Sequence, residues 1–305
     1  MTGAGGHLAA LLDADVFIVT SEVVPPRSGD VASARAAAQS LVGSVDAINV
    51  TDNPRASAHM SPLAGVHAVH DAGVEPTLQL VARDRNRLAI AADLLGGWAL
   101  GARNLLVLAG DPIERGDEPD AASVFDLRAD EVVALARRIR DEGVTASGTA
   151  VADPPRYLIG VADVPLGESY TVAKLEARID AGADVVWTQI AFDVERLEAW
   201  LDLLRDRGIL ERVRVLVGLV PLRSAANARF LDGLYGVHVP EAIHGALAEA
   251  GDDAEHVGLE LTIDVVRRLR TLDGVAGVHL MGIGRDDLVR AVVEGAGLFP
   301  RPTGG

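Results

Sequence analysis

A single glutamate stands where the first apolar run of the chain ends, in the stretch Ile18-Val19-Thr20-Ser21-Glu22-Val23-Val24. An apolar setting removes hydration from a carboxyl group, which raises its pKa and suits it to donate a proton near neutral pH. The simpler interpretation is an exposed glutamate that begins the turn at Pro25-Pro26. Glu22 is therefore a candidate general acid, with the turn residue as the alternative.

Two further apolar runs end in residues that suit a ligand. Gly110 precedes Asp111, and a glycine at such a place lets a ligand approach the backbone closely. Gln189 closes another run, and a buried amide is costly unless it is hydrogen-bonded. A turn or a helix cap is the alternative for Asp111, and an internal hydrogen bond is the alternative for Gln189.

Two arginines follow a third run, in the stretch Arg83-Asp84-Arg85-Asn86. Their charge suits an anionic group such as a phosphate, but Asp84 and the start of the next helix could equally neutralise them. The Asp52-Asn53-Pro54 stretch has the composition of an ordinary turn. The residue types here leave phosphate binding and internal ion pairing both open.

Several common catalytic motifs are missing from the sequence. None of the eight histidines forms His-Glu-x-x-His or a similar ligand spacing, so metal catalysis has little support. Neither the Gly-x-Ser-x-Gly turn of hydrolases nor the phosphate-binding loop Gly-x-x-x-x-Gly-Lys-Ser/Thr occurs. His279, inside the last apolar run, is interpreted as a core residue with satisfied hydrogen bonds.

Eight short runs rich in β-branched residues alternate with stretches of helical period, which predicts strands and helices in turn. The predicted strands are Val16–Ser21, Ala47–Thr51, Thr77–Val81, Asn104–Ala109, Tyr157–Ala162, Val185–Gln189, Val213–Val220 and Val278–Gly282. The predicted helices are Val31–Leu41, Met60–Ala72, Arg87–Leu100, Ala129–Asp141, Val172–Ala181, Val194–Arg207, Ala225–Leu234, Ala254–Leu272 and Asp286–Gly295. This alternation favours a single (β/α)8 barrel, a TIM barrel of the α/β class, with the active site at the carboxyl ends of the strands.

A doubly wound open sheet is the main rival fold, weakened because no Gly-x-Gly-x-x-Gly turn follows the first strand. Residues 1–305 are predicted to form one barrel domain, with residues 1–14 and 299–305 as flexible termini. The longest irregular segment, Asp111–Phe125, follows the fourth strand, and loops of that length are usually functional or disordered.

Composition limits the partners. The chain carries 44 acidic and 28 basic side chains and a net charge of −16, which argues against a nucleic-acid partner. It has no cysteine, which excludes disulfides and thiolate metal sites. No signal peptide and no run of about 18 apolar residues is found, so a cytoplasmic protein without a membrane partner is expected. A homo-oligomer is compatible with the sequence.

Taken in order, the ends of these runs resemble methylenetetrahydrofolate reductases. The resemblance rests on Glu22 with Pro25-Pro26, Asn49–Pro54, Gln79–Asn86, Gly110–Pro112, Asp180–Asp184 with Thr188-Gln189, Gly218 with Pro221, and Gly277–His279. Each fragment is common, whereas the ordered set covers nearly the whole chain and is specific. The Asp52–Pro54 and Arg83–Asn86 stretches resemble the branch that some bacteria fuse to a homocysteine methyltransferase more than the enteric branch.

The resemblance implies a (β/α)8 barrel that carries a flavin, usually FAD, and reduces 5,10-methylene-tetrahydrofolate to 5-methyl-tetrahydrofolate with NAD(P)H. Glu22 matches the acid that protonates N10 of the folate. Asp111 matches the residue beside the pterin and the flavin, and Gln189 matches the glutamine that binds the pterin. Phe192 is expected as a further folate contact. The expected flavin contacts are Thr51, Asn53, Gln79, Arg83, Ala109, Gly110 and Arg178.

Departures from the family pattern leave the cofactor and the reaction open. Ala109 stands in place of an arginine, Gln79 in place of a histidine, Arg178 in place of a lysine, and Val164–Ser169 in place of Tyr-Pro-Glu-x-His-Pro. The flavin could be FMN, or the enzyme could be flavin-free, with NAD(P)H delivering hydride directly. The same barrel could also serve a folate-dependent methyltransferase or demethylase, or a non-catalytic folate-binding subunit.

Overall fold

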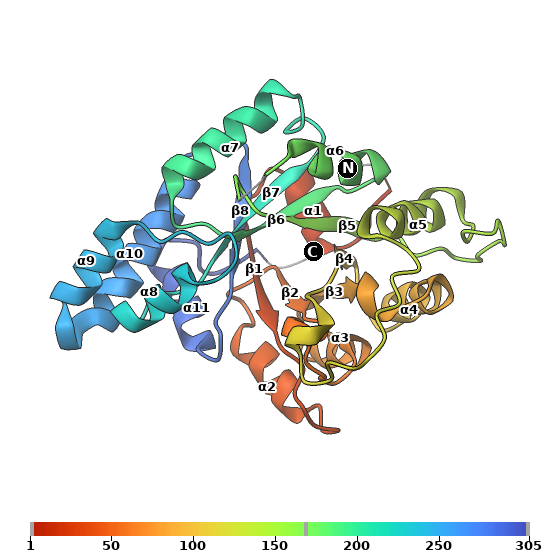
Figure 1. The fold of residues 1–305 in the computed structure, drawn as a ribbon, viewed down its shortest axis with the longest axis horizontal. Helices are drawn as coiled ribbons and strands as arrows, with labels where there is room; N and C mark the ends of the chain where they lie inside the picture. The colour runs from red at the N-terminus through yellow and green to blue at the C-terminus, as the bar shows by residue number, and fades with distance from the viewer. Residues whose placement is uncertain (1–2, 168–169, 303–305) are drawn as a thin grey trace.

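The computed structural model describes residues 3–167 and 170–302, and eight parallel strands form a closed barrel at its centre (Figure 1). The strands are β1 (Ile18–Val23), β2 (Ala47–Val50), β3 (Glu75–Val81), β4 (Asn104–Leu108), β5 (Leu158–Asp163), β6 (Val185–Ile190), β7 (Arg214–Leu219) and β8 (Val275–Leu280). Because β8 pairs with β1 and closes the sheet, the predicted barrel is confirmed and the open-sheet alternative is wrong.

The helices surround the strands (Figure 1). Those predicted from the sequence are α2 (Ala32–Ser40), α3 (Pro62–Asp71), α4 (Arg87–Ala99), α5 (Ala129–Glu142), α6 (Val172–Ala181), α7 (Val194–Asp206), α8 (Ala225–Asp232), α10 (Ala254–Leu269) and α11 (Asp286–Gly295). Periodicity does not predict α1 (His7–Asp13) or α9 (Glu241–Glu249). In α9 the helical pattern is short and Gly245 interrupts it, which weakens the signal. No helix among the described residues is both long and apolar enough to cross a membrane.

Successive residues of each strand face opposite sides of the barrel wall. On β2, Ile48 and Val50 pack into the apolar cluster shared with the surrounding helices, whereas Ala47 belongs to the cluster inside the barrel. Both faces of the wall are therefore buried, which is why the strands read as continuous apolar runs in the sequence.

Trp187 of β6 is the largest side chain of the interior cluster. The ring lies so close to β5 that a Cβ atom added at Gly160 would be 2.0 Å from its Cζ3 atom. Glycine at this position therefore makes room for the indole inside the barrel. The indole thus fills part of the barrel interior between β5, β6 and β1.

Helix α1 closes the opposite, amino-terminal end of the barrel. Leu8 and Leu12 are buried in the interior cluster, and the Leu8 N–H donates to Oε1 of Glu75 over 2.9 Å. The carboxylate thus sits at the helix N-terminus, where the helix dipole favours negative charge. Residues 7–13, part of the segment 1–14 that the sequence predicts to be flexible, thus form a helix anchored by two buried leucines.

Arg301 likewise ties down the second predicted flexible segment, residues 299–305, as far as the structure describes it. Its guanidinium forms two hydrogen bonds with the buried Asp46, at 3.0 and 2.7 Å, and a third with the carbonyl oxygen of Phe17. The Asp46 carboxylate also accepts the N–H of Val19 over 2.8 Å. This ion pair joins the end of the chain to β1 and the turn before β2.

Candidate active site

Glu22 lies on the inward face of β1 near its carboxyl end. Side chains along a strand alternate between its two faces, so Glu22 faces the same side as Ile18, which belongs to the interior cluster. The side chain is 21% exposed, and its Oε2 atom is 3.7 Å from Nε2 of His279 on β8. The carboxyl group is therefore partly buried at the barrel mouth.

His279 is buried, as the sequence predicts, but it has a second role that sequence reasoning missed. Its Nδ1 atom is 2.9 Å from the hydroxyl oxygen of Thr20, so only Nε2 faces Glu22. The indole N–H of Trp187 donates to the same hydroxyl over 3.4 Å, across the interior from β6 to β1. A hydrogen-bonded partner on one ring nitrogen fixes the orientation of an imidazole. Thr20 therefore holds His279 in place against Glu22.

Asp111 lies on the loop after β4 and is exposed. Its Oδ2 atom accepts the N–H of Arg55 over 2.9 Å, and Asp117 further along accepts the N–H of Ala58 over 2.9 Å. The segment predicted to be functional or disordered is thus bound to the loop after β2. Gly110 has a φ of 101°, a conformation that favours glycine, and positions Asp111 there.

Arg83 does not have the free guanidinium that a phosphate contact needs. The side chain is 2% exposed, donates two hydrogen bonds to Asp84 at 2.6 and 2.7 Å, and a third to the carbonyl oxygen of Asp111. Asn53 donates to Asp84 and accepts the N–H of His59. Burial opposes the ionisation of Asp84, but the hydrogen bonds from Arg83 and Asn53 outweigh it and lower the pKa of that carboxyl. Of the two alternatives that the sequence left open, the structure has internal ion pairing.

The remaining predicted flavin contacts differ in how available they are. Thr51 is buried and its hydroxyl has no hydrogen-bond partner among the described residues. Gln79 is buried on the inward face of β3. Ala109 is exposed on the loop, where its carbonyl oxygen accepts the N–H of Arg83. Thr51 and Gln79 therefore remain candidates for a ligand, whereas Arg83 and Asn53 do not fit that role in this arrangement.

Gln189 reaches the mouth from β6, but its amide has partners within the protein. Its Oε1 atom accepts the N–H of Ile190 over 3.0 Å, and its Nε2 atom donates to the carbonyl oxygen of Tyr235 over 3.2 Å. The pairing of β6 with β7 shifts register between Trp187 and Ile190, which places Gln189 in an irregular stretch of the strand. The internal hydrogen bond is thus present, so a pterin would have to replace Tyr235 as the acceptor.

Phe192, predicted as a folate contact, does not reach the mouth in the structure. The ring is 2% exposed and belongs to the cluster between the barrel wall and the helices. With Ile243 and Leu261 it borders a cleft on the helical side of the molecule. The chain turns outward into α7 directly after β6, and this turn carries Phe192 away from the barrel interior.

A cavity of about 500 Å³ opens at the carboxyl end of β5, with Asp163, Tyr170, Lys174, Arg178 and Tyr235 in its wall. Arg178 donates to the carbonyl oxygen of Ala162 over 2.6 Å, which directs its guanidinium to the strand end. Lys174 is the only lysine of the chain. Two cations in the wall of one cavity suit an anionic group in a protein whose net charge is strongly negative. The segment Val164–Ser169 borders this cavity, and its residues Glu168 and Ser169 lie outside the described part of the chain.

Asp163, in the wall of this cavity, makes the free energy of unfolding of the protein depend on pH. Burial raises the pKa of Asp163 above its ordinary value of 3.8, although the hydroxyl of Tyr170 donates to it over 3.0 Å. A carboxyl whose pKa is higher in the folded state loses stability as the pH rises through that folded-state value. The Asp163→Asn variant keeps an acceptor for Tyr170 and should be more stable than wild type at pH 7. Urea denaturation at pH 7 and near pH 3.5 tests this; an advantage that persists unchanged at the lower pH would contradict it.

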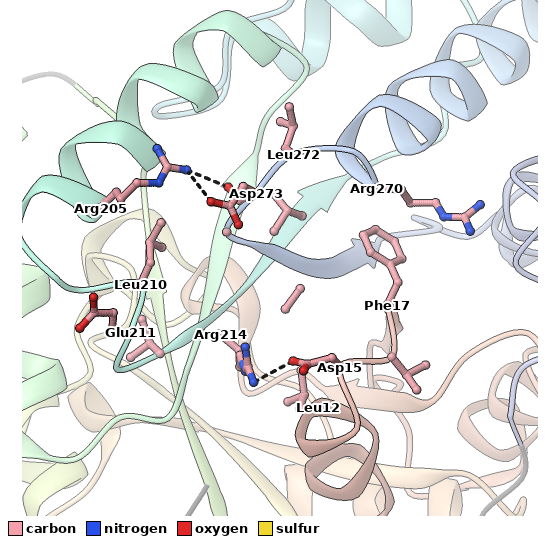
Figure 2. A pocket seen from close by; sticks show the side chains of 15 residues that line it. Leu12, Asp15, Phe17, Arg205, Leu210, Glu211, Arg214, Arg270, Leu272 and Asp273 are labelled. Carbon is pink, nitrogen blue, oxygen red and sulfur yellow. Dashed lines mark hydrogen bonds and ion pairs between the residues drawn. The ribbon is translucent and has the colours of Figure 1, made fainter.

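Another cavity, of about 570 Å³, lies at the amino-terminal end of the barrel (Figure 2). Its arginines have partners: Arg214 pairs with Asp15 at 3.0 Å, and Arg205 with Asp273 at 3.5 Å. Active sites of (β/α)8 barrels lie at the other end of the strands. This cavity therefore lies at the end of the barrel opposite to the expected active site. The candidate site is the mouth that holds Glu22.

The sequence and the fold are both similar to those of known proteins. The family model described as methylenetetrahydrofolate reductase matches residues 7–297. A relative from Schizosaccharomyces pombe named methylenetetrahydrofolate reductase 1 is 27% identical, in a match that covers 75% of this chain and 37% of the relative. A relative from Caenorhabditis elegans, named probable methylenetetrahydrofolate reductase (NADPH), is 26% identical over 74% of this chain and 33% of its own length. The chain thus spans about a third of the length of these two relatives.

Among solved structures, the crystal structure of a long-chain alkane monooxygenase superposes with a TM-score of 0.54. The sequences are 13% identical, and the match covers 95% of this chain and 94% of the other. At this identity the likeness concerns the fold alone.

Proposed function

The chain belongs to the methylenetetrahydrofolate reductase family, and from that premise we propose that it reduces 5,10-methylene-tetrahydrofolate to 5-methyl-tetrahydrofolate with NADH or NADPH. The observation that carries the proposal is the partly buried carboxyl of Glu22 at the barrel mouth, held against His279. The name of the Caenorhabditis elegans relative supports a nicotinamide reductant.

In the proposed reaction Glu22 transfers its proton to N10 of the folate, and the imidazolidine ring opens to an iminium cation. A hydride from the reductant then adds to the exocyclic carbon and forms the methyl group. Glu22 is left as a carboxylate and must regain one proton before the next turnover.

Asp111 and Gln189 are proposed to bind the folate at the same mouth. A carboxylate beside the iminium stabilises its positive charge as that charge develops. The amide of Gln189 can both donate to and accept from a pterin once the Tyr235 carbonyl oxygen is displaced. Both residues lie at the carboxyl ends of strands, and their side chains do not contact each other in the structure.

The FAD predicted from the resemblance fits the chain only in part. The hydroxyl of Thr51, without a partner in the described part of the chain, and the cations Lys174 and Arg178 are suitable contacts. Arg83 and Asn53 are engaged by Asp84. A bound flavin would carry the hydride from NAD(P)H to the folate. The alternative, in which NAD(P)H delivers hydride directly, needs none of these flavin contacts.

Two measurements on the purified protein test the proposed function. Oxidation of NADH or NADPH should depend on methylene-tetrahydrofolate and yield 5-methyl-tetrahydrofolate. Turnover that requires a methyl donor or acceptor instead would favour a methyltransferase, and binding without turnover would favour a folate-binding subunit. The visible spectrum then separates the two reductases, because a flavin enzyme is yellow and bleaches with NADH, and a flavin-free enzyme is colourless.

His279 is expected to act as a positioning residue for Glu22. Replacement by phenylalanine keeps the ring but removes both hydrogen-bonding nitrogens, so kcat should fall about 10-fold or more while KM for the folate changes little. The His279→Gln variant, which keeps a donor toward Glu22, should recover part of the loss. Steady-state kinetics of the two variants check this; equal activity of wild type and His279→Phe would remove His279 from the mechanism.

A further inference from the structure

A row of polar side chains runs along the inward faces of strands β1 to β4. Strand pairing places Glu22 beside Asn49, Asn49 beside Thr77, and Thr77 beside Asn104. Residues paired in this way face the same side of a sheet, and Glu22 faces inward. The neighbours of the row on each strand, such as Ile48 and Leu78, pack outward against the helices instead. All four polar side chains therefore line the interior.

The row leads from one end of the barrel to the other. Glu22 is near the carboxyl end of β1, whereas Asn104 is the first residue of β4. Beyond Asn104 the row reaches Glu75, whose Oε1 atom accepts the amide of Asn104 over 2.9 Å. Glu75 is half-buried at the N-terminus of α1, which closes the amino-terminal end. A polar path thus connects the proposed proton donor with the opposite face of the molecule.

The middle of the row has unused hydrogen-bonding capacity. Both polar atoms of the Asn49 amide, the hydroxyl of Thr77 and Oδ1 of Asn104 are buried and have no partner among the described residues. A buried polar group without a hydrogen bond is costly, so native proteins satisfy such groups with ordered water when the protein offers no partner. A site with two to four polar partners is the kind that binds a water molecule. Asn49, Thr77 and Asn104 together offer such a site.

We infer that this row holds a chain of ordered water molecules that returns a proton to Glu22 from the amino-terminal end of the barrel. The inference rests on the proposed function, in which Glu22 loses one proton per turnover. The folate and the nicotinamide would both cover the mouth, so an internal route lets Glu22 be reprotonated while ligands are bound. A proton from bulk water enters beside Glu75, each water passes one proton on, and the last water protonates the Glu22 carboxylate.

Thr77→Val tests the route, because valine has the shape of threonine without its hydroxyl. In the proposed reaction the first turnover needs only the proton that the general acid brings to it, so the single-turnover rate should stay within twofold of wild type. Every later turnover needs the route, so the steady-state rate should fall about 10-fold, with a burst of one product per site. Thr77→Ser should restore the wild-type rate. Asn49→Leu interrupts the row at another point and should give the same burst.

Ser44→Ala is the matched control, since Ser44 has a buried hydroxyl without a partner among the described residues but lies outside the row. It should show no burst. Two results would overturn the route while leaving the reductase intact. One is a steady-state rate of Thr77→Val within twofold of wild type, and the other is a single-turnover rate that falls as much as the steady-state rate. A wild-type protein without reductase activity would overturn the proposed function instead.

A crystal structure tests the route without relying on activity or on the folding of a variant. Ordered water bonded to the Asn49 amide and to the Thr77 hydroxyl is expected in the wild-type protein. A dry row in a map that resolves other buried water would overturn the inference.

Discussion

Replacing Glu22 by glutamine is expected to lower kcat/KM for methylene-tetrahydrofolate reduction by about 10²–10⁴-fold, the usual contribution of a general acid. The amide has nearly the same size as the carboxyl and can still pack beside His279 and Asn49. It has no acidic proton to give to N10, so the imidazolidine ring would stay closed. Binding of tetrahydrofolate needs no proton transfer and should change little.

The measurement is the folate-dependent oxidation of NAD(P)H, with folate binding followed by calorimetry and folding by circular dichroism. Glu114→Gln is the matched control, since this glutamate is exposed on the loop after β4 and should leave the rate within twofold of wild type. If Glu22→Gln turns over at the wild-type rate, the assigned acid is wrong. The family and the fold would remain as they are.

Arg301→Met is expected to lower the free energy of unfolding by about 3–5 kcal/mol, the usual cost of removing one partner of a buried ion pair. The Asp46 carboxylate would stay buried and would keep the hydrogen bond from the N–H of Val19, but it would lose its cation. Methionine fills a similar volume, so the loss would come from the unpaired charge rather than from a cavity.

Urea denaturation of wild type and variant measures this difference. The control is Arg212→Met, which removes an exposed pair with Asp180 and should cost under about 0.5 kcal/mol. A second variant, Asp46→Asn combined with Arg301→Met, removes both charges and should recover part of the stability. Equal stability of wild type and Arg301→Met would mean that the last part of the chain does not hold β1 and the β2 turn together.

The two ends of the barrel are held by different contacts. At the amino-terminal end, helix α1 and Glu75 close the interior, and the Arg301–Asp46 pair fixes the segment after α11 to β1. At the carboxyl end, the loop after β4 is bound to the loop after β2 through Asp111.

Much of the fold could be predicted from the sequence, because its signals are local. Runs such as Val185–Gln189 are apolar on both faces, and this pattern belongs to parallel strands covered by helices. The number of such runs and their alternation with helices then predict a barrel. Glu22 is also visible, because its place at the end of the first strand needs no knowledge of distant residues.

The partners of each polar side chain, by contrast, were decided by the tertiary structure. By sequence His279 resembles a core residue, and only closure of the barrel between β8 and β1 brings its second nitrogen to Glu22. Arg83 has the charge for a phosphate, but the fold brings Asp84 and the Asp111 carbonyl oxygen to its guanidinium. Hydrogen bonds and ion pairs act over a few ångströms between residues far apart in the chain, so pairing depends on strand register. Composition and periodicity determined the strands of this protein, and register determined its site.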